Sequence, residues 1–235
     1  MNILQKIRKP EFTLTLAVFL LIFSCSQYEI QNRKFDYGIY EAYKANSSVL
    51  SSNLSDFAKS AGNLQDAKDI LDDVNSEYGT SMQIPDKVLN AIFTLKTKNE
   101  IDTFLVQEKI LINQEIGLIT TFIQDADDFS FQTAMDNYEN SVIALNPSNK
   151  QFERYNLINN SLRIMDDHNP NLFDNSVVSS ECMICCIYNY VMWVVAVVVA
   201  FVACAGPQAA LFCWAAVIAL IERTISTAEA CAGYM

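Results

Sequence analysis

The sequence predicts an all-α protein, in which an acidic bundle-like domain is followed by a hydrophobic helical hairpin. Only six glycines and five prolines occur in 235 residues, few for a protein built from short strands and turns. Apolar residues in the middle of the chain recur in steps of three and four, the spacing of one helix face. The forty residues from Cys182 to Ile221 carry no formal charge and are interrupted once, at Gly206-Pro207-Gln208, which predicts two helices and a turn.

Charge is distributed unevenly along the chain. Residues 1–24 carry a net charge of +2, residues 25–181 carry −12, and residues 182–235 carry −1, for a total of −11. An acidic middle and an almost uncharged tail favour different environments for the two parts. The excess of acid also argues against nucleic acid as a partner, because phosphate contacts need lysine and arginine.

The acidic domain is expected over residues 35–167. Its clearest helix is Leu64–Tyr78, with Asn63 as a cap at its start and Gly79 at its end. Ser148 to Gln151 has the spacing of a capping box and opens a helix to about residue 167. Other helices are expected over residues 35–46, 49–61, 102–125 and 130–145 and from Pro85. Residues 168–181 contain Pro170 and are interpreted as a linker.

The first 24 residues have the organisation of a signal peptide. Lys6, Arg8 and Lys9 provide positive charge before an apolar run of 12 residues, Phe12 to Phe23. A helix needs about 20 apolar residues to cross a bilayer, so this run is too short to span one. Its length suits the apolar part of a secretory signal.

The residues Ile22-Phe23-Ser24-Cys25 resemble the lipobox of bacterial lipoprotein precursors. The resemblance implies lipid on the Cys25 thiol, cleavage after Ser24, and acylation of the new amino terminus by a fatty acid such as palmitate. It also implies that Ser26 permits sorting to the outer membrane, and that residues 25–34 are a lipidated tether. Phe23 departs from the pattern, since a small residue is commoner there. An uncleaved anchor or an ordinary signal peptide is the alternative.

Six of the seven cysteines lie in the hairpin at a helical spacing. Cys186 and Cys204 are 18 residues apart, as are Cys213 and Cys231. Eighteen residues make five helical turns, so each pair lies on one helix face about 27 Å apart. A single antiparallel register places Cys186 opposite Cys231 and Cys204 opposite Cys213. We therefore predict these two disulfides. The short connection at Pro207 makes the Cys204–Cys213 bridge the more difficult of the two to form.

Cys182 and Cys185 form a Cys-x-x-Cys sequence whose role the spacing leaves open. They could pair with each other or with Cys231. They could also bind zinc together with Cys186 and Cys231, act as a redox pair, or be small apolar residues of a buried helix. Export to an oxidising compartment favours disulfides over the zinc site. The redox pair is disfavoured because no thioredoxin-like βαβ pattern surrounds it.

No catalytic or metal-binding motif is evident elsewhere. His168 is the only histidine, and its place before Asn169-Pro170 predicts a solvated helix end rather than a metal ligand. Asp125, Asp127 and Asp128 do not start a calcium loop, since Ser130 and Asp136 stand where glycine and glutamate are required. We therefore expect no metal, no cofactor and no enzymatic activity.

The tail resembles the cysteine-rich, halocin-type bacteriocins over residues 182–235, through its cysteine density, hydrophobicity and terminal position. Our first hypothesis is a non-enzymatic, lipid-anchored protein of the bacterial cell envelope that interacts with a partner. Its disulfide-stapled hairpin would contact or enter a membrane over residues 182–221. The alternatives are a bacteriocin-like toxin precursor whose hairpin disrupts membranes, a simple membrane anchor, and a hairpin that forms the core of the acidic domain.

Overall fold

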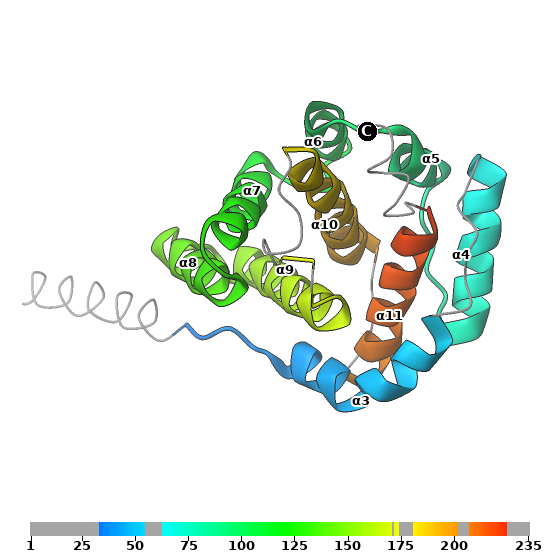
Figure 1. Cartoon of the computed structure of the whole chain (residues 1–235), viewed down its shortest axis with the longest axis horizontal. Coiled ribbons are helices and arrows are strands. Elements are labelled where there is room, and N and C mark those ends of the chain that lie inside the picture. Colours follow the sequence, from blue (N-terminus) through cyan, green and yellow to red (C-terminus); the bar gives the residue numbers. More distant parts are fainter. Residues whose placement is uncertain (1–32, 55–62, 171, 174–180, 202–206, 225–235) are drawn as a thin grey trace, which may run out of the picture.

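The described part of the chain is all-helical, as the sequence predicts. The computed structural model describes residues 33–54, 63–170, 172–173, 181–201 and 207–224, and within these ranges it contains nine helices and no strand. Figure 1 shows α3, α4 and α5 around one side of the molecule and α7, α8 and α9 on the other. The helices are α3 (Gly38–Leu54), α4 (Leu64–Tyr78), α5 (Asp86–Thr94), α6 (Lys98–Gln107), α7 (Asn113–Asp128), α8 (Phe131–Ala144), α9 (Asn149–His168), α10 (Glu181–Phe201) and α11 (Pro207–Thr224).

Helices α10 and α11 lie in the middle of this arrangement and pack against each other (Figure 1). Every residue from Tyr188 to Val198 and from Trp214 to Ile221 is buried. α9, α6 and α7 pack on α10, while α3, α4 and α5 pack on α11. A helix that is apolar all round needs such a cover on every side.

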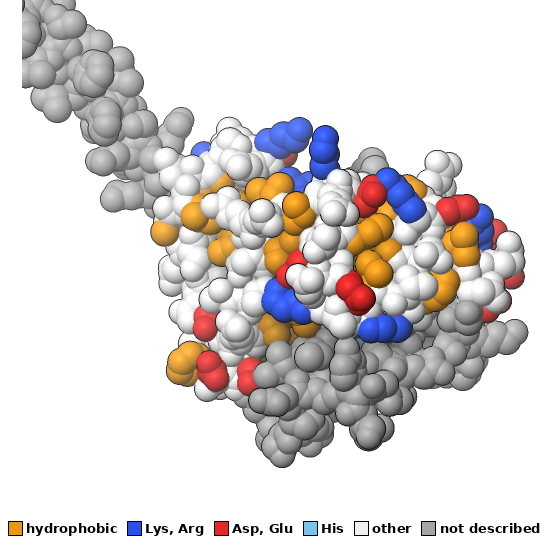
Figure 2. Space-filling view, turned by 90° about the horizontal axis from the view of Figure 1, so that it is seen from above, with side chains coloured by type: hydrophobic (Ala, Val, Ile, Leu, Met, Phe, Trp, Pro, Cys, Tyr) orange, Lys and Arg blue, Asp and Glu red, His pale blue; other side chains and the backbone are white. Residues whose placement is uncertain are grey.

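The acidic helices and the hairpin share one hydrophobic core. Its buried residues run from Phe35 to Ile221, so residues 168–181 do not separate two cores. Among the residues that the structure describes, no helix has the length and hydropathy of a membrane-spanning segment. On the face seen from above, charged side chains are interspersed with hydrophobic ones (Figure 2).

The helix ends predicted from capping residues are confirmed. The Asn63 side chain accepts hydrogen bonds from the backbone N–H groups of Gln65 and Asp66, and Gly79 ends α4 in the left-handed conformation with φ of 62°. Ser148 and Gln151 form the predicted capping box at the start of α9. Local hydrogen bonds of this kind depend on a few adjacent residues, so the sequence alone reveals them.

The prediction of a single helix over residues 102–125 was wrong, because the chain forms two helices there, α6 and α7. α6 begins four residues earlier, at Lys98, where Thr97 and Glu100 form a capping box. The chain then leaves the helix at Lys109, whose φ is 56°, and the Ile110 N–H donates to the Leu105 carbonyl at 2.9 Å. This turn buries both Ile110 and Leu111, which a continuous helix would direct differently.

The two helices predicted over residues 35–46 and 49–61 also differ from the structure. α3 runs without interruption from Gly38 to Leu54, across the Asn46–Ser48 segment that the sequence marked as a break. Its Tyr43 side chain is buried in the common core, and packing of this kind outweighs weak local helix propensity. Residues 55–62 lie outside the described residues.

Replacement of Trp193 by alanine should test the central position of α10. Trp193 is fully buried, and its ring centroid lies 5.9 Å from that of Phe104 in α6. We expect Trp193→Ala to lower the free energy of unfolding by about 3–5 kcal/mol, because a large cavity would remain. Urea denaturation followed by circular dichroism measures this.

Phe129→Ala provides the control, because Phe129 is 68% exposed and its loss should change stability by less than about 0.5 kcal/mol. Similar effects of the two substitutions would contradict the central position of α10.

Candidate functional site

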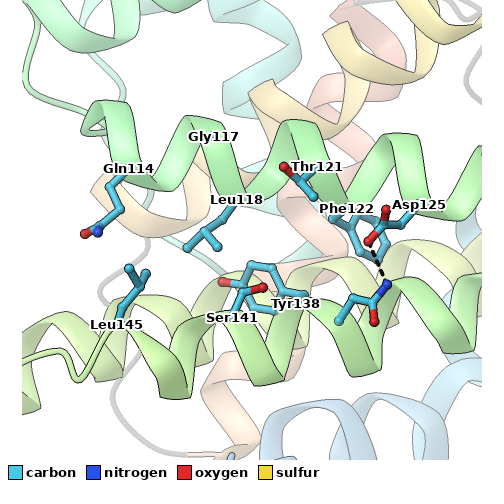
Figure 3. A pocket seen from close by; sticks show the side chains of 10 residues that line it. Gln114, Gly117, Leu118, Thr121, Phe122, Asp125, Tyr138, Ser141 and Leu145 are labelled. Carbon is cyan, nitrogen blue, oxygen red and sulfur yellow. Dashed lines mark hydrogen bonds between the residues drawn. The ribbon is translucent and has the colours of Figure 1, made fainter.

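A groove between α7 and α8 is the candidate binding site (Figure 3). It encloses about 210 Å³ and is open to solvent along one side. Its floor consists of the buried Phe122 and Tyr138 and the half-buried Leu118. The rim is polar, and the remaining lining residues are Gln114, Gly117, Thr121, Asp125, Asn137, Ser141 and Leu145.

The floor of the groove is fixed by aromatic contacts and one hydrogen bond. The Phe122 ring meets Phe131 and Phe173 edge-on, at centroid distances of 5.8 and 5.4 Å. The Tyr138 hydroxyl donates to the Tyr155 carbonyl in α9 at 3.2 Å. These contacts hold both rings in place from the side of the core.

A buried ion pair holds the start of α7 against α9. Glu115 is only 2% exposed, and its two carboxylate oxygens accept hydrogen bonds from the Arg154 guanidinium at 2.6 and 2.8 Å. Arg154 also donates to the Ile110 carbonyl at 2.9 Å. The Glu115 carboxylate raises the pKa of Arg154 by hydrogen bonding. The bidentate geometry fixes both the position and the rotation of α7.

Gly117 leaves a gap in the wall of the groove. It lies in the second turn of α7, inside the helix, where glycine disfavours the helix by about 1 kcal/mol relative to alanine. A Cβ atom built at this position would have no neighbouring atom within 4 Å. Packing within the described chain therefore gives no reason for a glycine, whereas close approach of a bound partner would.

The two ends of the groove differ in character. At one end, Leu145 lines the groove beside Gln114, and Ile112 precedes α7; Leu145 is 42% exposed and Ile112 is 45% exposed. At the other end, Asp125 accepts a hydrogen bond from the Asn137 amide at 2.9 Å. The exposed carboxylates of Asp127, Asp128 and Asp136 lie near this end in sequence and make it acidic.

The prediction that His168 is a solvated helix end was wrong. Its side chain is only 13% exposed, and it connects three helices. His168 Nδ1 lies 3.2 Å from the Tyr43 hydroxyl of α3, and Nε2 lies 3.1 Å from the Glu222 carboxylate of α11. Burial, with Glu222 nearby, raises the pKa of Tyr43. The histidine thus connects the hairpin to its cover, a contact between distant residues that no local pattern reveals.

The pKa of the carboxyl group of Asp166, two residues before His168, is also shifted. Burial, with the charge of Asp167 beside it, raises the pKa of Asp166 to about 6.

In the part of the chain that the structure describes, no three histidine, cysteine, aspartate or glutamate side chains are grouped as metal ligands. Asp125, whose surroundings in the sequence do not fit a calcium loop, lines the groove.

Most of the predicted cysteine sites lie outside the described residues. These are Cys25, Cys204 and Cys231, and the side chains of Cys182, Cys185 and Cys186, whose backbone belongs to α10. Cys213, on α11, is half-buried and disulfide-bonded. Its partner is therefore one of these six cysteines, and the pairing with Cys204 stays a prediction.

Comparison with known proteins found no similarity: no protein-family model, no curated protein and no solved structure matches this chain.

The sequence did not predict the groove, although one residue of the sequence could have indicated it. Gln114, Thr121 and Ser141 are ordinary exposed helix residues in sequence, and only the pairing of α7 with α8 brings them together. Gly117 is the signal, because a glycine within an amphipathic helix calls for a packing or binding reason.

Gly117→Ala should stabilise the free protein. The new methyl group meets no atom within 4 Å, and alanine favours the helix, so we expect the free energy of unfolding to rise by about 0.5–1 kcal/mol. Urea denaturation is the measurement.

The matched control for this substitution is Gly79→Ala, where φ of +62° makes alanine unfavourable and stability should fall. A loss of stability in Gly117→Ala would show that Gly117 serves internal packing.

Cys213 should be joined to Cys204 when the protein folds in an oxidising compartment. We expect a peptide map without reductant to contain a Cys204–Cys213 cross-link and a Cys186–Cys231 cross-link, because one register allows both. The Cys186–Cys231 bridge should stabilise the folded protein by roughly 2–4 kcal/mol in the chain-entropy model. The same digest after reduction is the control, and a link from Cys213 to any other cysteine would contradict the register.

Proposed function

We propose that this chain is a non-enzymatic, lipid-anchored interaction protein of the bacterial cell envelope, held in the outer membrane. The observation that carries this proposal is the short distance along the chain between the lipobox-like cysteine and the folded body. Cys25 precedes Arg33 by eight residues, and Arg33 already contacts the turn before α9. Such a chain suits a protein held close to a membrane by lipid and otherwise exposed to water.

The groove between α7 and α8 is the surface that we assign to the partner. Its rigid floor, its polar rim and the gap at Gly117 would let a segment of another protein lie close to α7. The acidic end favours a basic group in that segment, since opposite charges across an interface set its orientation. Binding of this kind requires no reaction, in agreement with the proposed non-enzymatic role.

The hairpin has a different place in this proposal from the one expected at first. In the folded chain, α3, α4 and α9 pack against α10 and α11, so contact of the buried stretches, residues 188–198 and 214–221, with a membrane would require these helices to separate. Both the membrane-inserted hairpin and the toxin precursor stay predictions that involve such an opening. The interaction protein needs no opening, and we therefore prefer it.

Cys25→Ser should abolish lipid attachment. The substitution removes the thiol on which the lipid is expected, so the protein should leave the membrane fraction or stay unprocessed. Metabolic labelling with a radioactive fatty acid, followed by fractionation, measures both effects. Cys213→Ser is the matched control and should keep its label, and equal labelling of the wild type and Cys25→Ser would refute the anchor.

A further inference from the structure

The tether joins the folded body at a defined place, the turn between α8 and α9. The Arg33 guanidinium donates to the Pro147 carbonyl and, at 3.0 Å, to the Asn149 side chain. The same group lies over the Phe152 ring at 5.6 Å. These contacts fix the position at which the chain from Cys25 enters the described structure.

The residues after Arg33 strengthen this attachment. Phe35 is 7% exposed and packs on Phe152 and Tyr138, at centroid distances of 5.1 and 6.4 Å. The Asp36 N–H donates to the Asn156 side chain at 2.9 Å. Because three of the four residues from Arg33 to Asp36 make these contacts, the entry point cannot shift along the surface without loss of core packing.

The length of the tether limits which surface can reach the membrane. Eight residues can span at most about 28 Å, at roughly 3.5 Å per residue. A compact body of about 190 residues is roughly 40 Å across. Figure 1 shows α8 beside the start of the described chain and α4 and α5 on the opposite side. A lipid on Cys25 therefore keeps the α8–α9 turn near the membrane and α4 away from it.

The side chains at this end suit a lipid surface. Lys34 and Lys150 are exposed, Arg33 is half-buried, and Lys109 is exposed in the loop that Arg154 fixes before α7. Leu145 and Ile112 are, with Phe129, the large hydrophobic side chains that stand most exposed in the described ranges. Asp36 and Glu153 are exposed acids of the same region, so its charge is mixed within an otherwise acidic domain.

We infer that the end formed by Arg33, Lys34, the α8–α9 turn and the loop before α7 rests on the membrane surface that holds the lipid. This surface would present anionic headgroups to Lys34 and Lys150 and the interfacial region to Leu145. The α7–α8 groove then opens beside the membrane at its Leu145 end and points its acidic end away. The inference rests on the proposed lipid anchor and adds the face on which the protein lies.

The test uses the full-length, lipidated protein on vesicles of phosphatidylethanolamine and phosphatidylglycerol. A fluorescent amino acid is introduced at the position of Leu145 or, as the matched control, of Phe129. Both positions are exposed, and they are separated by the length of α8, about 21 Å. Nitroxide groups on the lipid headgroups should quench the fluorophore at position 145 at least threefold more than the one at position 129.

Flotation of the vesicles separates the two proposals. Protein that fails to float lacks the anchor, and the inference falls with it. Protein that floats but shows equal quenching, reversed quenching or none at position 145 keeps the anchor and overturns the inferred face. The double variant Lys34→Glu/Lys150→Glu should halve the quenching at position 145, whereas Lys68→Glu in α4 should leave it unchanged; equal signals in both would overturn the basic contact with the headgroups.

Discussion

The fold depends on keeping the uncharged α10–α11 hairpin away from water. Its buried stretches carry apolar side chains on every side of the helix, so packing against a single neighbouring helix would not cover them. Helices α3, α4, α5, α6, α7 and α9 solve this by packing their apolar faces on the hairpin, while most of their charged side chains stay in contact with water. At roughly 25 cal/mol per Å² of buried apolar surface, this burial is the dominant favourable contribution to folding. The acidic domain therefore depends on the tail as much as the tail depends on the domain.

The polar contacts follow from that arrangement. Where helices of the cover meet the hairpin, polar groups become buried and need partners. His168 meets Tyr43 and Glu222 at one such junction, and Tyr188 of α10 hydrogen-bonds Asp102 of α6 at another. Burial, together with the Asp102 hydrogen bond, raises the pKa of Tyr188 and keeps its hydroxyl protonated as a donor. These contacts fix the order of the helices around the core, which apolar packing alone specifies less sharply.

Local features of the fold could be predicted from the sequence, and contacts between distant residues could not. Asn63, Gly79 and Ser148 act through hydrogen bonds within a few residues, so their roles were visible. The break at Lys109 exists because Ile110 and Leu111 both enter the core, a requirement set by helices far along the chain. The groove likewise arises from two helices that are each unremarkable, and only Gly117 marks it in sequence. The helical fold is accordingly well predicted, and the candidate site is not.

If Cys25 carries the lipid that we propose, the short tether gives the groove a direction that the fold by itself does not. α7 and α8 are antiparallel helices of similar length, and in free solution a partner could approach the groove from either end. Once Arg33 is held near a membrane, the Leu145 end faces lipid, and the Asp125 end remains accessible from the aqueous side. A partner in the same membrane and a partner free in solution would then reach different ends of one groove. The acidic charge at the Asp125 end favours the second, because a basic segment can reach it without crossing the lysines near the tether.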